Sequence, residues 1–286
     1  MNIELARTFL EVVSTGSMSR AADRLNVTHS TVTVRIKTLE DILRRRVLNR
    51  NRSGISLTAD GVRFQRHAED LVRIWQMTRK QMSLASGFAG LLSMGAESSL
   101  WQDIMLRWAS DMRHNRPDVA LRCESGTNEF LVDRLFSGWL DFCVVHEVQS
   151  RSGFSIEPLF DDPIVTVSTR RRETMPWDPE FVEVDWGASI TRQSEMRWGE
   201  IDETPKVSAS DQWIALKIIE EFGGSTVIPQ RLLNAGLISR PLYPIDGEPA
   251  LERKAYLMYS EKSLKERVPK LTPKDIKSAI LACSKM

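Results

Sequence analysis

Apolar residues at helical spacing predict two short helices at the start of the chain. Leu5, Phe9 and Val12 recur at intervals of four and three, which predicts a first helix that Gly16 ends. Ser17 is then placed to cap a second helix. This second helix contains two adjacent alanines, in the sequence SRAADRL, and their small side chains allow another helix to cross it closely.

A third helix is predicted after a tight turn. Thr28 can cap it, and Val32, Ile36 and Leu39 then share one inward face. The polar residues that this leaves to point outward are His29, Ser30, Thr33 and Arg35. Two helices joined by a tight turn are typical of a helix-turn-helix, whose second helix enters the major groove with its N-terminal residues at base edges. The alternative is a small helical packing domain whose polar face is only solvated.

The segment after the third helix predicts a β-hairpin wing. Arg50 and Arg52 flank a turn centred on Gly54, between short extended segments. Cations at such a hairpin can hold the DNA backbone, while hydroxyl, imidazole and guanidinium groups of the helix can hydrogen-bond bases. The candidate DNA-binding residues are Ser17, Thr28, His29, Ser30, Thr33, Arg35, Lys37, Arg50 and Arg52.

A long helix is predicted next, because residues 58–85 contain no proline and one early glycine. Along one stripe of this helix, the intervals between successive residues alternate between four and three for three heptads. The residues are Phe64, Ala68, Leu71, Trp75, Thr78, Met82 and Ala85. Such a seam is typical of a coiled coil. We therefore expect residues 58–87 to join two copies of the chain through Phe64, Ala68, Leu71, Trp75 and Met82. The alternative is that the seam packs against its own chain.

From residue 91 onward, predicted strands alternate with predicted helices. LLSMGA, VALRCES and FCVVH are expected strands, with helices between them, and KVSAS, STVIP and RKAYLMYS form a later series around the helix DQWIALKIIEEF. This alternation predicts an α/β fold with mainly parallel, doubly wound sheets. The length fits two α/β subdomains of about 80 residues each, with residues 163–177 crossing between them.

Composition places the chain among cytoplasmic globular proteins of two or three domains. It has 286 residues, of which 42% are hydrophobic and 27% charged. The first residues lack the features of a signal peptide, and no stretch is apolar enough for a membrane span, so we expect no membrane partner. The cysteines are Cys123, Cys143 and Cys283, an odd and sparse set that fits a reducing cytosol.

Charge divides the chain into a basic head and an acidic body. Residues 1–86 hold 15 Lys and Arg against 8 Asp and Glu, whereas the remainder holds 24 against 30. This division favours a polyanion as the partner of the head alone. Uneven surface charge without a polyanionic partner is the plainer interpretation.

A small-molecule site is predicted where strands of the body end and helices begin, as in other α/β folds. Backbone N–H groups and the helix dipole at these positions favour an anion, and the hydroxyls add donors, although ordinary N-capping explains the same residue types. The candidate effector-binding residues are Ser98, Ser99, Trp101, Gly126, Thr127, Asn128, Ser208 and Ser210. The proposed loops contain no Lys or Arg, so a strongly acidic effector lacks an evident ion pair.

Enzymatic chemistry finds little support in the sequence. The four histidines have no metal-ligand spacing, and there is no nucleophile elbow or phosphate-binding loop, so no metal or cofactor is expected. Asp161 and Asp162 form a carboxylate pair that is more typical of a solvated turn. We interpret Cys123 and Cys143 as buried structural thiols; a redox switch between them is the less favoured alternative.

The stretch from Leu5 to Gly61 resembles the DNA-binding domain of LysR-type transcriptional regulators. The resemblance rests on GSMSRAADRL, the LE pair at residues 39–40, and LTADG. His29 and Ser30 stand where the family usually has Gln and Pro, and this departure changes the expected base preference. The segments SSLW and VDWG indicate a subgroup that resembles the H-NS-dependent flagellar regulator.

The resemblance implies a domain plan: a winged helix-turn-helix in residues 1–57, a linker and dimerisation helix in 58–87, and a two-lobed, periplasmic-binding-protein-like effector domain in 88–286. Lobe I would span residues 88–162 with a C-terminal return, and lobe II residues 163–262.

The function that the resemblance implies is regulation of transcription. Such a protein binds promoter DNA as a homodimer or homotetramer and responds to a small-molecule effector. RNA polymerase is a further partner that the resemblance allows. The alternatives are an enzyme fused to a DNA-binding head and a DNA-binding regulator that needs no effector.

Overall fold

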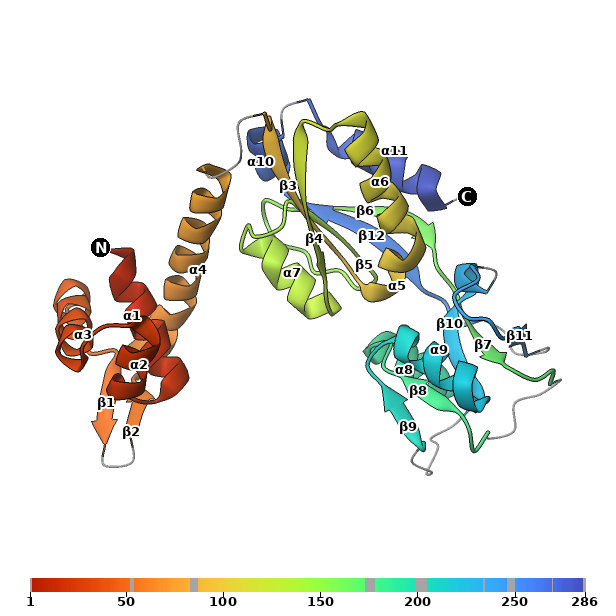
Figure 1. Cartoon of the computed structure of the whole chain (residues 1–286), viewed down its shortest axis with the longest axis horizontal. Helices are drawn as coiled ribbons and strands as arrows, with labels where there is room; N and C mark the ends of the chain where they lie inside the picture. Colours follow the sequence, from red (N-terminus) through yellow and green to blue (C-terminus); the bar gives the residue numbers. More distant parts are fainter. Residues whose placement is uncertain are drawn as a thin grey trace. The chain divides into compact units, whose positions relative to one another are not determined.

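The chain forms two compact units, residues 1–86 and residues 87–286 (Figure 1). The structure is a computed structural model. It describes residues 2–51, 54–82, 87–172, 178–198, 205–233, 235–245, 250–268 and 270–284.

Three capped helices build the first unit: α1 (Ile3–Thr15), α2 (Met18–Leu25) and α3 (His29–Leu43). Ser17 and Thr28 are the N-caps of α2 and α3, and their side-chain oxygens accept hydrogen bonds from backbone N–H groups in the first turns of these helices. These caps confirm the helix starts that the sequence predicts, because a cap needs only one suitable side chain close by in the chain.

The core of this unit is the predicted inward face. Phe9, Val32, Ile36 and Leu39 are at most 1% exposed, and the two alanines of α2 pack in the same cluster. The predicted wing is an antiparallel hairpin of β1 (Leu48–Asn51) and β2 (Gly54–Leu57).

Helix α4 (Ala59–Met82) divides the predicted seam into two parts. Ala68 is fully buried in the core of the first unit, and Phe64 meets Phe9 edge to face with ring centroids 5.1 Å apart. Leu71, Trp75 and Met82 remain 39%, 47% and 83% exposed within the chain. The prediction that Ala68 serves dimerisation is therefore wrong, because the core of its own unit covers it. The same role for Phe64, which is partly buried, stays a prediction. Ala85 lies outside the described residues.

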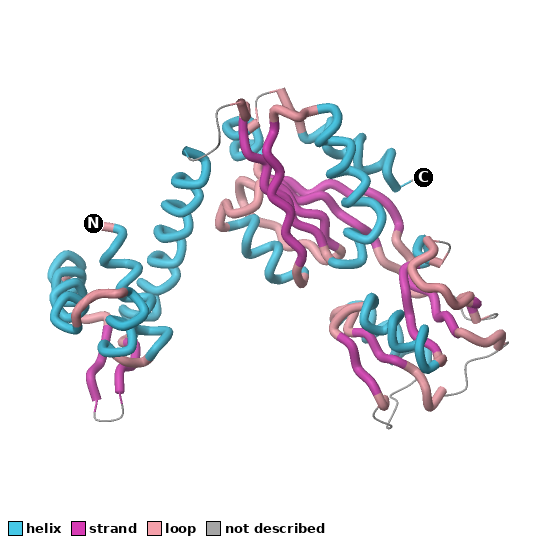
Figure 2. The backbone as a smooth tube through the Cα atoms, in the orientation of Figure 1, coloured by secondary structure: helices cyan, strands magenta, loops and turns pink. Residues whose placement is uncertain are grey.

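The described strands of the second unit form two groups, one in each lobe (Figure 2). The first sheet has five strands in the order β4-β3-β5-β12-β6. Their bounds are β3 (Gly90–Ala96), β4 (Val119–Ser125), β5 (Phe142–Val145), β6 (Ser155–Asp161) and β12 (Lys254–Tyr259). Strands β3, β4 and β5 are parallel, whereas β12 runs antiparallel to both of its neighbours.

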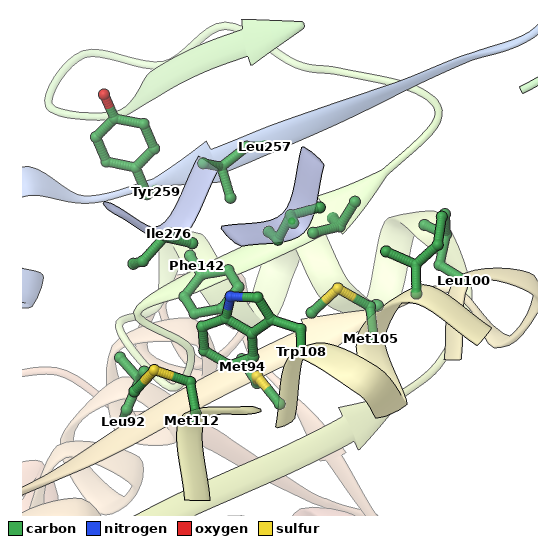
Figure 3. Packing of buried hydrophobic residues seen from close by; sticks show 14 of the residues in the cluster. Leu92, Met94, Leu100, Met105, Trp108, Met112, Phe142, Leu257, Tyr259 and Ile276 are labelled. Atoms are coloured by element: carbon green, nitrogen blue, oxygen red, sulfur yellow. The ribbon is translucent and has the colours of Figure 1, made fainter. Parts of the chain in front are cut away.

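Helices and a large apolar cluster complete this first lobe. Trp108 meets Phe142 edge to face, with ring centroids 5.4 Å apart, and methionines surround the pair (Figure 3). The helical segments are α5 (Ser98–Leu100), a π-helical turn (Trp101–Met105), α6 (Leu106–Asn115), α7 (Asn128–Phe136), α10 (Glu261–Arg267) and α11 (Pro273–Ser284).

The second lobe repeats the arrangement of the first. An antiparallel sheet has the order β10-β7-β11, a parallel pair joins β8 to β9, and a parallel bridge from Phe181 to Ser225 links the two. The elements are β7 (Ile164–Ser168), β8 (Val182–Val184), α8 (Ala188–Trp198), β9 (Val207–Ala209), α9 (Gln212–Phe222), β10 (Ser225–Pro229), a 3-10 turn (Gln230–Leu232) and β11 (Tyr243–Pro244).

Two features differ from the sequence prediction. Strands β7 and β12 run against their neighbours, because each enters its sheet after the chain has crossed from the other lobe. For the same reason β12 lies in the first sheet, and the predicted extension of lobe II to residue 262 is wrong. No helix in the described ranges is long and apolar enough to cross a membrane.

The first turn of α4 contains a close approach that only glycine permits. A Cβ atom on Gly61 would lie 2.0 Å from the carbonyl oxygen of Val47. Ordinary glycine-to-alanine changes in helices are stabilising by about 1 kcal/mol. We expect Gly61→Ala to have the opposite sign and to lower the free energy of unfolding by about 1–3 kcal/mol. Urea unfolding measures this, and an increase in stability would contradict the close approach.

Candidate functional site

The outward face of α3 is the candidate DNA-binding surface. His29, Ser30 and Lys37 are exposed on this helix, as the sequence predicts. Val34 is also 63% exposed, and the sequence analysis did not identify it. Imidazole, hydroxyl and ammonium groups can contact base edges or phosphates, and an exposed apolar group can meet a thymine methyl.

Arg35 and Thr33 do not point freely outward. Arg35 Nη1 donates a hydrogen bond to Thr8 Oγ1 at 3.2 Å and lies 3.5 Å from a carboxylate oxygen of Glu4. The Thr33 hydroxyl is buried without a partner among the described residues. The prediction of an outward orientation is wrong for both. Arg35 directly precedes buried Ile36, and at 3.6 residues per turn it lies only about 60° from the centre of the inner stripe.

The wing places Arg50 on β1, where its backbone pairs with Ile55 of β2. Arg52 lies outside the described residues. DNA contact by these two arginines stays a prediction.

A cavity of about 600 Å³ lies between the two lobes of the second unit. Six of the predicted effector-binding residues line it, namely Ser98, Ser99, Gly126, Thr127, Asn128 and Ser210. The N-termini of α5, α7 and α9 bring them together, as expected for loops that follow strands. Thr127 also caps α7 by accepting a hydrogen bond from the Phe130 N–H, so capping and cavity lining coincide here.

Two predicted effector residues do not line this cavity. The Trp101 indole N–H donates to the Glu124 carbonyl oxygen at 3.0 Å, and its ring packs against the core of the first lobe. The Ser208 hydroxyl donates to a carboxylate oxygen of Glu183 at 2.6 Å. Both side chains are engaged by their own lobe, a result that residue type and position in the sequence do not reveal.

The sequence gives no signal for a buried histidine in the cavity wall. His146 follows β5, and its side chain is 4% exposed. Its Nδ1 lies 2.8 Å from Glu97 Oε2, and its Nε2 lies 3.0 Å from Asp162 Oδ2. The imidazole therefore bridges two carboxylates through both of its ring nitrogens.

Two arginines extend this charged cluster across both lobes. Arg253 Nη2 lies 2.6 Å from Asp162 Oδ2, and Arg231 Nε lies 2.8 Å from Asp162 Oδ1. Arg231 also reaches Asp103 in the first lobe at 2.6 Å and the carbonyl oxygen of Ser99 at 2.7 Å. Asp162 is 2% exposed, so its interpretation as part of a solvated turn is wrong.

The cluster shifts the ionisation of its carboxylates. Burial acts to raise the pKa of Asp162, but the hydrogen bond from His146 and the charges of Arg253 and Arg231 outweigh it and hold this pKa well below its ordinary value. Burial likewise opposes ionisation of Glu97, and the hydrogen bond and charge of His146 lower its pKa on balance. Both carboxylates are therefore charged at neutral pH.

The cysteines of the sequence prediction have different surroundings. Cys143 is fully buried, whereas Cys123 is exposed, so the interpretation of Cys123 as a buried thiol is wrong. Desolvation raises the pKa of both thiols, so the thiolate, which is the reactive form, is disfavoured at each position. This disfavours a redox switch between them.

A winged helix-turn-helix followed by two lobes around a polar cavity defines a class: a transcriptional regulator that carries its DNA-binding and ligand-binding parts in one chain. Residues 3–62 match the family described as "Bacterial regulatory helix-turn-helix protein, lysR family", and residues 85–271 match "LysR substrate binding domain".

Relatives and solved structures agree with this class. The HTH-type transcriptional regulator HdfR of Escherichia coli (strain SE11) is 30% identical over 258 residues, which cover 86% of this chain and 91% of HdfR. Full-length CbnR in complex with its target DNA has a TM-score of 0.67 at 16% identity and covers 100% of this chain and 99% of CbnR. A full-length OxyR variant from Pseudomonas aeruginosa has a TM-score of 0.58 at 19% identity, with 99% and 96% covered.

The chain belongs to the LysR family of transcriptional regulators. The match to HdfR also confirms the subgroup that the sequence pattern indicated.

The exposed residues of α3 are expected to have separable roles. Replacing His29 with Ala removes a group at the helix N-terminus that can contact a base edge, and we expect it to change the preference among sequences. Replacing Lys37 with Ala removes one cation, so it should weaken binding to all duplexes alike and reduce the slope of log affinity against log salt by about one. Fluorescence anisotropy at several salt concentrations measures both. Identical effects of the two variants on every duplex would contradict the assignment.

Asp162 is expected to be essential for stability. Replacing it with Asn removes the carboxylate that Arg231, Arg253 and His146 share, and we expect a loss of about 3–5 kcal/mol in the free energy of unfolding. Because its pKa is lowered in the folded state, the stabilisation is complete above the ordinary aspartate pKa of 3.8 and is lost as pH falls below it.

Denaturant unfolding at a series of pH values tests this. The free energy of unfolding of the Asp162→Asn variant should fall less steeply as the pH is lowered than that of the unchanged protein. Asp161→Asn is the matched control, since the Asp161 side chain is 76% exposed and should matter little. Equal losses for the two variants would show that the cluster does not carry the stability.

Proposed function

We propose that this chain regulates transcription as a dimer, in which two α3 helices contact the halves of an inverted repeat in promoter DNA and a small molecule in the interlobe cavity changes their action. The observation that carries the proposal is the exposed polar face of α3, held by a capped and fully packed three-helix core.

Base recognition is assigned to the exposed end of α3. His29 and Ser30 stand at the helix N-terminus, the part that reaches base edges in helix-turn-helix proteins. Lys37 and the wing arginines Arg50 and Arg52 are assigned to phosphates. Arg35 contributes indirectly, because its bonds to Thr8 and Glu4 fix the angle between α3 and α1.

Dimerisation is assigned to the second half of α4. Leu71, Trp75 and Met82 continue a heptad pattern and are exposed within one chain, together with Ile74 at 55%. An apolar stripe of this length on a helix that is otherwise polar favours a second copy of the chain as its partner. We extend the proposal to a tetramer built from two such dimers and to a contact with RNA polymerase. The exposed stripe of α4 supports the dimer alone.

Effector control is assigned to the cavity, because its walls come from both lobes. A ligand that contacts both walls stabilises one lobe arrangement over others, and such differential binding is what allosteric control requires. The family and the relatives named above are transcriptional regulators, so the alternative of an enzyme fused to a DNA-binding head gains no support from them. We place this activity in the cytoplasm, where promoter DNA is found.

Genomic footprinting of the bound protein tests the proposal, followed by gel shifts with the recovered promoter fragments against unrelated competitor DNA. We expect protected sites with two half-sites in inverted order. An absence of preference for any fragment at low ionic strength would refute DNA recognition, and a response unchanged by every small molecule tested would favour the effector-independent alternative.

The dimer assignment has its own test. We expect Leu71→Glu or Trp75→Glu to convert the protein to monomers, because each places a charge in an apolar interface, and to weaken operator binding by about 100-fold or more through loss of the second half-site. Light scattering measures the mass. His67→Glu, at an exposed position of α4 outside the seam, is the control and should remain dimeric. A persistent dimer in both seam variants would refute the seam.

A further inference from the structure

The wall of the interlobe cavity is acidic. Five carboxylates line it, whereas no Lys or Arg does so within the described part of the chain, and the imidazole of His146 is the sole lining group able to carry positive charge there. The lining carboxylates are Glu97, Glu129, Glu147, Asp185 and Asp211.

The buried cluster beside the cavity does not offset this charge. It contains the carboxylates of Glu97, Asp103 and Asp162, and its two arginines, Arg231 and Arg253, pair with Asp103 and Asp162. The imidazole of His146 lies between Glu97 and Asp162. Neither arginine lines the cavity, and the other four lining carboxylates form no ion pair within the described ranges.

Helix N-termini would normally favour an anion at this position, but the chain already supplies one to each. Asp211 caps α9 by accepting a hydrogen bond from the Trp213 N–H at 2.6 Å, and Glu129 stands in the first turn of α7. An N-terminus carries about half a positive charge, and each of these carboxylates carries a full negative one. The balance at both helix ends is thus negative.

The carboxylates of Glu129 and Glu147 are the ones most available to a ligand. Both residues are exposed, and neither carboxylate has a hydrogen bond or an ion pair within the described ranges. Asp185 accepts a hydrogen bond from the Gly187 N–H at 3.0 Å, so it is partly engaged.

Three polar groups on other lining residues are buried and lack partners. Ser99 is 2% exposed and Gln212 is 1% exposed, yet the Ser99 hydroxyl and the Gln212 side-chain nitrogen have no hydrogen-bond partner in the described structure. The indole N–H of Trp186, another lining residue, is also unpaired there. Buried donors without partners are costly, and a bound ligand oxygen would satisfy them.

We propose that the cavity binds a small cation that bears an amine or guanidinium group at one end and a hydrogen-bonding oxygen at the other. Glu129 and Glu147 hold the positive group at the rim, and Ser99, Gln212 and Trp186 receive the oxygen at the floor. This inference rests on the proposed function only for the consequence of binding, since the ligand class follows from the cavity itself.

Matched amino acids that differ in side-chain charge test the ligand class. Calorimetric titration of the full chain at low ionic strength is made with arginine, agmatine, glutamine and glutamate as probes. We expect arginine to bind saturably, with a dissociation constant at least tenfold below that of glutamate, and glutamine to fall between; agmatine, which has the guanidinium group but no oxygen, should bind more weakly than arginine. Equal binding of arginine and glutamate, a reversed order, or no saturable binding of arginine at millimolar concentration would overturn the proposal.

Variants then locate the site. The double variant Glu129→Gln, Glu147→Gln should raise the dissociation constant of the cation about tenfold, since each half-exposed ion pair contributes up to about fivefold. Glu195→Gln is the control, because it removes an exposed carboxylate of the second lobe that does not line the cavity. An equal effect of the control variant would place the binding elsewhere and overturn the assignment.

Gel shifts with the same proteins separate this inference from the proposed function. If glutamate binds in preference and alters the gel shift, the charge class is wrong while regulation by a ligand stands. If no DNA is bound at all, the proposed function fails, and the titration still decides which charge the cavity accepts.

Discussion

Asp162 contacts three basic side chains that come from different parts of the second unit. Arg231 belongs to the second lobe, Arg253 precedes the strand that returns to the first sheet, and His146 directly follows a strand of the first sheet. A buried carboxylate is stable only with such partners, and the partners in turn would be unstable without it. The cluster thereby links the two lobes beside the cavity, which Glu97 and His146 line.

The carboxylates of the rim set the electrostatics of the cavity. The two arginines of the cluster are paired with buried carboxylates and do not line the cavity. The helix ends that face the cavity are balanced by Glu129 and Asp211 before any ligand arrives. A fold whose strand ends commonly bind anions therefore presents the opposite charge here.

The first unit exposes one face of helix α3 and buries the opposite face. Val32, Ile36 and Leu39 anchor α3, and Arg35 fastens its flank to α1 through Thr8. Helix α4 contributes to this core at its beginning and leaves an apolar stripe at its end. One helix can thus stabilise the DNA-binding head within a chain and offer a surface to a second chain.

The sequence by itself determined what depends on near neighbours. Helices α1, α3 and α9 and strands β3, β4 and β10 were predicted closely, because apolar periodicity and a capping side chain act over a few residues. The loops around Ser98, Thr127 and Ser210 were predicted as one site by the rule that strand ends gather at one edge of a sheet. Only the tertiary structure decided three features: the antiparallel direction of β7 and β12, which part of the α4 seam is buried, and the burial of Asp162. Asp161 and Asp162 are identical neighbours, yet one is exposed and the other buried, because the arginines that neutralise Asp162 lie 69 and 91 residues away in the chain.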